Sequence, residues 1–96
     1  MDLFIFGRFH ARSGNEEKVA TTLLDVVAPT RAEPGCISIN AFRSTGDPQL
    51  FFIHTHWKDV QAFERHVILP HTVHFIERMT PLIDNPLELI RTEKIG

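Results

Sequence analysis

Histidine is the residue type in this sequence best suited to acid–base chemistry, and six histidines occur among 96 residues. An imidazole with its ordinary pKa of about 6.5 can accept or donate a proton close to neutral pH. His66 falls three residues after Phe63, at the edge of a helically spaced apolar stretch, and His71 follows Pro70. We therefore take His66 and His71 as candidate proton acceptors, and the alternative for each is a structural hydrogen bond.

A second set of histidines is expected on one side of a sheet. His54 and His56 are two residues apart, which places their side chains on the same side of a strand, and His10 on a neighbouring strand could join them. Such a trio would resemble a zinc site, but no Asp or Glu is obviously placed with it, so we predict no metal. Arg8 shares a face with His10 and could bind an anionic substrate oxygen, or it could be exposed or interface charge.

The charge balance and the single cysteine exclude several classes of protein. Ten basic against twelve acidic residues give a formal charge of -2 without a basic stripe, so we expect no nucleic-acid partner. The apolar runs are far shorter than the roughly 20 residues that cross a bilayer, so we expect no membrane span. Cys36 cannot form an internal disulfide, and the chain starts directly with a strand-like segment. These features predict a reducing, cytoplasmic setting.

The elements that must position these residues alternate between strand and helix. Four runs have the composition of strands: Leu3–Arg12, Cys36–Ser44, Leu50–Lys58 and Leu87–Ile95. Helical spacing predicts one helix from Asn15 to about Glu33, a second from Asp59 to Leu69, and a third that starts at Pro70. Asn15 and Asp59 are the expected N-caps, and Pro29 predicts a kink or break near Val27 and Ala28.

The order of these elements predicts the fold class. Strand, helix, strand, strand, helix, strand is the βαββαβ order of a ferredoxin-like α+β sandwich with a four-stranded antiparallel sheet, formed by residues 1–96 as a single domain. Helices can cover only one face of such a sheet. Both faces of the first strand are nevertheless apolar, with Leu3, Ile5 and Phe9 on one side and Phe4 and Phe6 on the other. A second copy of the chain is the simplest cover, so we expect a homodimer.

Three groups of residues resemble the antibiotic biosynthesis monooxygenase family, and the resemblance spans nearly the whole chain. The most specific group surrounds the end of the third predicted strand and the helices after it. The three groups are Arg8–Arg12 with Gly14; Arg31–Cys36; and Trp57–Asp59 with Ala62, Phe63, His66, Pro70, His71 and Phe75. Members of this family are dimeric α+β barrels of about this length, which implies a dimeric barrel here too.

The resemblance also implies an activity: a cofactor-independent, quinol-monooxygenase-like enzyme that oxidises a small quinol or polyphenol with O2. A deprotonated aromatic diol can itself pass an electron to O2, so the protein supplies a base, an apolar pocket and donors to the anion. His66 or His71 is then the catalytic base. The residues expected to contact the substrate are Trp57, Phe63, His54, Arg8, His10 and Phe75.

Three positions depart from the patterns of characterised relatives. Thr55 stands where many relatives carry a Glu, Ile53 where polyketide monooxygenases use an Asn, and Gly7 where haem-degrading relatives need an Asn. The substrates of those enzymes are therefore not transferred to this chain. Two alternatives stay open: an isomerase or signal-degrading enzyme that acts on a small carbonyl compound, and a non-catalytic small-molecule binding or stress-response protein.

Overall fold

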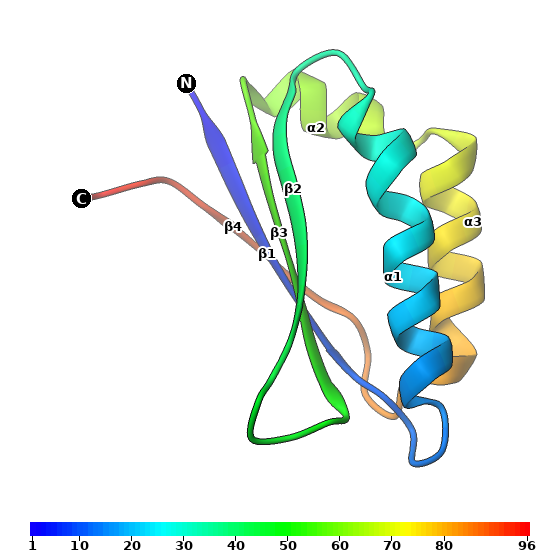
Figure 1. Cartoon of the computed structure of the whole chain (residues 1–96). Helices are drawn as coiled ribbons and strands as arrows, with labels where there is room; N and C mark the ends of the chain where they lie inside the picture. The colour runs from blue at the N-terminus through cyan, green and yellow to red at the C-terminus, as the bar shows by residue number, and fades with distance from the viewer.

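Four strands and three α-helices make up the computed structural model, which describes residues 1–96 (Figure 1). Their order is the one predicted from the sequence. The elements are β1 (Leu3–His10), α1 (Glu16–Arg31), β2 (Cys36–Arg43), β3 (Leu50–Trp57), α2 (Val60–Val67), α3 (Pro70–Met79), a one-turn 3-10 helix (Thr80–Leu82) and β4 (Glu88–Thr92).

The strands form one antiparallel sheet in the order β2-β3-β1-β4. Figure 1 shows α1 and α3 side by side along one face of this sheet, with α2 across its upper end, while the opposite face carries no helix. In the central pair, Ile5 lies opposite Thr55 and Phe9 opposite Phe51. The arrangement confirms the predicted ferredoxin-like α+β fold.

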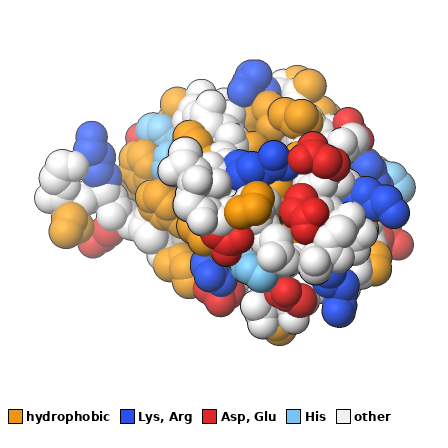
Figure 2. Space-filling model, turned by 60° about the horizontal axis from the view of Figure 1, so that its bottom comes forward, with side chains coloured by type: hydrophobic (Ala, Val, Ile, Leu, Met, Phe, Trp, Pro, Cys, Tyr) orange, Lys and Arg blue, Asp and Glu red, His pale blue; other side chains and the backbone are white.

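The two faces of the sheet differ in burial. Alternate residues of β1 and β3 point under the helices, and Ile5, Phe9 and Trp57 are almost fully buried there. On the opposite face Phe6 and Ile90 form a cross-strand pair and remain 50% and 55% exposed. Hydrophobic side chains gather on the sheet side of the molecule in Figure 2, beside the projecting C-terminal segment. An apolar layer of this kind is typical of an interface, and the homodimer stays a prediction.

Helix α1 continues through Pro29, so of the kink or break predicted near Val27 and Ala28 the break is wrong. Proline withholds a hydrogen bond from the carbonyl of Asp25, which lies on the exposed side of the helix and can bind water instead. Val26 and Thr30 on either side of Pro29 are buried and hold the last turns against the sheet. The packing of these two side chains therefore outweighs the tendency of Pro29 to end the helix.

The two predicted N-caps have different outcomes. Asp59 caps α2 as expected, because its carboxylate accepts a 2.8 Å hydrogen bond from the backbone N–H of Ala62. Asn15 makes no such bond, and the Glu16 carboxylate instead accepts one from the Gly14 N–H at 2.7 Å.

No helix of the chain is both long enough and apolar enough to cross a bilayer.

Candidate functional site

A carboxylate shared by two histidines lies at the end of α1. Oε2 of Glu33 accepts hydrogen bonds from Nδ1 of His66 at 2.7 Å and from Nε2 of His71 at 2.6 Å. The Glu33 side chain is only 7% exposed, and His66 is 12% exposed. The cluster therefore joins the end of α1, the last turn of α2 and the first turn of α3 in a largely dry environment.

Two local features of the chain bring these residues together. Pro70 cannot continue α2, so Leu69 adopts an extended conformation and α3 starts in a new direction with His71 in its first turn. Gly35, with a φ of +91°, makes the tight turn after Glu33. A Cβ atom on Gly35 would lie 2.6 Å from the Cβ of Ala62, so this turn packs directly against α2.

The environment of His66 favours a neutral ring. Burial lowers the pKa of His66, and nearby His71 lowers it further, while the hydrogen bond and the negative charge of Glu33 oppose the change without cancelling it. Because the carboxylate can only accept, the ring carries its proton on Nδ1. The hydroxyl of Thr72, 3.2 Å from the same Nδ1, is a second acceptor. Nε2 of His66 then holds a free lone pair and makes no hydrogen bond within the chain.

An aromatic wall supports His66. The Trp57 ring is completely buried, and its centroid lies 4.7 Å from that of the His66 ring. The indole N–H donates a 2.8 Å hydrogen bond to the hydroxyl of Thr55. The Phe63 ring packs against Trp57 with the centroids 5.9 Å apart. These contacts limit the orientations open to the imidazole.

A cavity of about 260 Å³ opens beside His66, between the sheet and the helices. Most of its lining is apolar, and His66 and three threonine residues are its only polar members. The threonines are Thr30, Thr55 and Thr72. Two larger hollows, of about 440 and 370 Å³, lie elsewhere on the surface and contain no histidine. The smaller cavity is therefore the better candidate for a site that needs a base.

The structure groups five of the eight predicted site residues around this cavity. Phe63, His66 and Phe75 line it, while Trp57 and His71 stand directly behind His66 and Glu33. These five come from β3, α2 and α3, as the family resemblance implies.

The other three predicted site residues lie on the opposite face of the sheet. Arg8 is exposed there, and His54 packs between the Phe4 and Phe6 rings. Burial lowers the pKa of His54, and nearby His56 adds to this effect. His10 also points away from the helices, so none of the three reaches the cavity.

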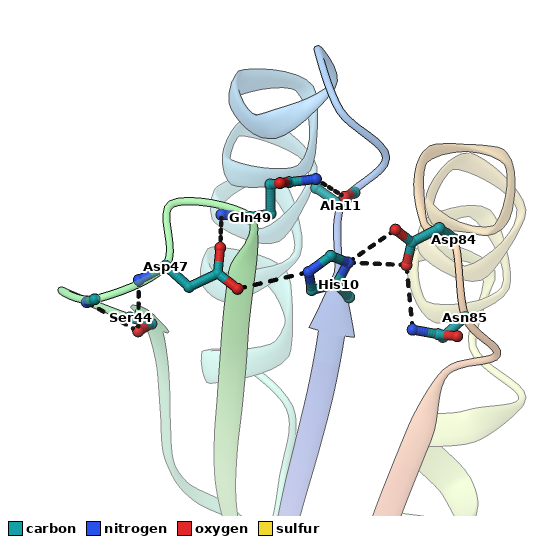
Figure 3. A network of polar contacts seen from close by, with 8 residues as sticks. His10, Ala11, Ser44, Asp47, Gln49, Asp84 and Asn85 are labelled. Atoms are coloured by element: carbon teal, nitrogen blue, oxygen red, sulfur yellow. Dashed lines mark hydrogen bonds and ion pairs between the residues drawn. The ribbon is translucent and has the colours of Figure 1, made fainter.

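His10 belongs instead to a separate polar network at the end of β1 (Figure 3). Its Nδ1 lies 2.9 Å from both carboxylate oxygens of Asp84, and its Nε2 lies 3.6 Å from a carboxylate oxygen of Asp47. The Gln49 amide donates to the Ala11 carbonyl at 2.9 Å beside it. This network ties the β2–β3 hairpin to the segment before β4, which is a structural role.

Glu33 was not among the residues predicted for the site. It is also part of the one group of residues that could bind a metal ion, because the ligand atoms of Glu33, His66 and His71 lie within 4.8 Å of one another. The three sheet histidines, His10, His54 and His56, do not form such a group. Metal binding would require both imidazoles to lose the protons they now donate, since distances of 2.6 and 2.7 Å are those of charge-assisted hydrogen bonds.

Comparison with known proteins identifies the family. Residues 3–78 match the antibiotic biosynthesis monooxygenase family, and the chain belongs to it. It is 29% identical over 77 residues to YcnE of Bacillus subtilis, which carries a provisional monooxygenase name. The matched residues span 80% of this chain and 81% of YcnE. Family membership and this name support a monooxygenase-like function.

Two further relatives extend the comparison. The protein sll1783 of Synechocystis is 23% identical over 87 residues, which span 91% of this chain and 59% of the length of that protein. The structure of Rv0793 from Mycobacterium tuberculosis superposes with a TM-score of 0.94 at 20% identity, over 100% of this chain and 97% of that one. The structural similarity to Rv0793 supports the fold.

Proposed function

We propose that the protein is a cofactor-independent monooxygenase that oxidises a small quinol or polyphenol with O2 in the cavity beside His66. The observation that carries the proposal is the 2.7 Å hydrogen bond from His66 Nδ1 to Glu33 at the edge of an apolar cavity. A buried carboxylate that holds one ring nitrogen leaves the other free to act as a base on a bound molecule.

In the proposed reaction, Nε2 of His66 accepts the proton of a substrate hydroxyl. The resulting anion is electron-rich, and it passes an electron to O2, after which the two radicals combine to form a carbon–oxygen bond. The O–O bond then breaks, so that one oxygen atom stays on the ring and the other leaves as water with protons from the substrate and His66. The substrate supplies all four electrons needed to reduce O2, which is why no further reductant enters.

Each part of the cavity has a role in this scheme. The apolar lining excludes water, which strengthens the interaction of the substrate anion with the protonated His66. Glu33 stabilises the imidazolium that forms when His66 accepts a proton. His71, which donates to the same carboxylate, helps to hold Glu33 in place. The second sheet of a homodimer would cover Phe6, Phe42 and Ile90, which are each at least half exposed.

A second candidate is an isomerase that acts on a small carbonyl compound. The observation in its favour is that a buried carboxylate holds His66 and can stabilise its imidazolium, so this one ring could remove a proton from one atom of the compound and return it to another. Such an enzyme would not consume O2. A non-catalytic binding protein would also use the cavity, but without turnover.

Oxygen uptake distinguishes these functions. Purified protein is mixed with a panel of reduced quinols in an O2 electrode, with and without a chelator, and the products are identified by mass spectrometry. We expect uptake that the chelator does not change and that His66→Ala lowers by at least about 100-fold. His74→Ala, on the exposed side of α3, is the matched control and should behave as wild type. Uptake no faster than in buffer would refute the proposal for those substrates.

A further inference from the structure

Thr30 carries the one buried side-chain polar atom of the chain that has no hydrogen-bond partner. The residue is 0% exposed, and no donor or acceptor of the chain meets its hydroxyl oxygen in hydrogen-bonding geometry. Native proteins rarely leave such a group unpaired, because burying it costs free energy that no bond returns. An unpaired buried hydroxyl therefore needs an explanation.

Other threonines in this chain show that a helix can satisfy such a hydroxyl by itself. Thr22, two turns earlier in α1, donates a 2.7 Å hydrogen bond to the carbonyl of Lys18, and Thr80 donates one of the same length to Ile76. Each acceptor lies four residues before its donor. Thr30 makes no equivalent bond to the carbonyl of Val26, so its hydroxyl has no partner within α1.

The position of Thr30 in the cavity suggests that a bound molecule could be the partner of its hydroxyl. Thr30 lines the cavity beside His66. The two other threonines of the lining already have contacts, since Thr55 accepts from Trp57 at 2.8 Å and Thr72 lies 3.2 Å from His66 Nδ1. Thr30 is thus the polar group of the lining that has no partner in the protein.

The size and charge of the cavity limit the ligand. An apolar cavity of about 150 Å³ can hold benzene, so the 260 Å³ here suits one substituted ring. No acidic or basic side chain apart from His66 lines the cavity, so a neutral ligand fits best.

We propose that Thr30 selects the ligand by hydrogen bonding to a second oxygen atom on a single neutral ring, whose first hydroxyl faces His66. The inference rests on the proposed function in taking His66 as the partner of the first hydroxyl. It adds that Thr30 is the residue that recognises the second oxygen substituent of the substrate and so distinguishes it from a ring with only one.

Binding of two probes that differ by one hydroxyl tests this selection. Hydroquinone and phenol are titrated into wild-type protein, Thr30→Val and Thr21→Val by calorimetry without O2, so that no turnover occurs. Valine has the shape of threonine without the hydroxyl, and Thr21 is an exposed residue of the same helix. In wild type and Thr21→Val we expect hydroquinone to bind about tenfold more tightly than phenol. In Thr30→Val the two Kd values should become similar through loss of hydroquinone affinity alone.

Thermal unfolding without a ligand gives a second readout. If the Thr30 hydroxyl is unpaired, Thr30→Val should have a Tm equal to or above that of wild type, because the cost of burying the hydroxyl disappears. A Tm several degrees lower would show that the hydroxyl is bonded within the protein, and would overturn the inference.

Failure of this inference and failure of the proposed function give different results. No binding of either probe, or the same preference for hydroquinone in wild type and Thr30→Val, would overturn the role of Thr30 whether or not the protein consumes O2. A lost preference in Thr30→Val combined with no O2 uptake would support the binding role and refute the oxygenase.

Discussion

Glu33 accepts a 2.7 Å hydrogen bond from Nδ1 of His66, and this bond leaves Nε2 of the same ring without a partner in the chain. The contact joins residues 33 positions apart, one after the end of α1 and the other in the last turn of α2. Because burial favours a neutral ring, Nε2 holds a lone pair, and His66 lines the cavity. The chemistry proposed for this protein depends on that pair of residues.

Replacing the carboxylate should move the pH profile of the enzyme. His66 must be neutral to act as a base, so activity rises as pH increases through its pKa. Glu33 raises that pKa by its hydrogen bond and its charge, so Glu33→Gln should shift the acid limb of the kcat profile to lower pH. Loss of ring orientation should lower kcat about 10- to 100-fold. Glu64→Gln, an exposed change in α2, is the control. An acid limb that stays in place would contradict the role of Glu33.

The two histidines should differ in how much activity they supply. His66→Ala removes the proposed base, and kcat/KM should fall about 100- to 10,000-fold. His71→Ala removes only one of two hydrogen bonds to Glu33, so a loss of roughly tenfold is expected. Steady-state O2 uptake measures both. If His71→Ala were the inactive variant and His66→Ala the mild one, the roles would be reversed.

The turn after Glu33 should be sensitive to any side chain. In Gly35→Ala, a φ of +91° and a Cβ 2.6 Å from Ala62 should together lower the free energy of unfolding by about 3 kcal/mol. Gly14 has a φ of +90° with no atom within 4 Å of an added Cβ, so Gly14→Ala should cost only about 1 kcal/mol. Urea denaturation compares them. Equal losses would show that the contact with α2 does not restrict Gly35.

The uncovered face of the sheet should control the oligomeric state. Wild-type protein is expected to be a dimer, and Phe6→Glu should give a monomer, because it places a charge at the centre of the apolar layer. Val73→Glu, at an exposed position of α3, should leave the dimer intact. Sedimentation equilibrium at micromolar concentration measures the mass. A wild-type protein that stays monomeric there would refute the dimer.

The fold could be predicted because its signals are local. Asp59 before an apolar helix and Pro70 after Leu69 mark boundaries that depend on neighbouring residues only. The helix through Pro29 departs from this pattern because burial of Val26 and Thr30 outweighs one lost backbone bond. Local signals therefore determine most element boundaries, whereas packing explains why α1 continues through Pro29.

The site was harder to predict because its contacts are long-range. Glu33 is one acidic residue before a Pro-Gly turn, and no spacing rule connects it with histidines 33 and 38 positions away. The sequence did contain a signal for the face of the sheet on which His54 lies. Trp57 and Ile53 differ from His54 by odd numbers of residues, so burying them under the helices turns His54 outward.

The protonation state of His66 tests the central claim most directly, and nitrogen-15 NMR of its imidazole ring can report it in the metal-free protein. At neutral pH we expect a neutral ring with its proton on Nδ1, and we expect the Nε2 resonance to shift when a quinol is bound without O2, because Nε2 then accepts a hydrogen bond from the quinol hydroxyl. A ring protonated on Nε2 before the quinol is added, or an Nε2 resonance that the quinol does not change, would contradict the proposed role of His66 as the base.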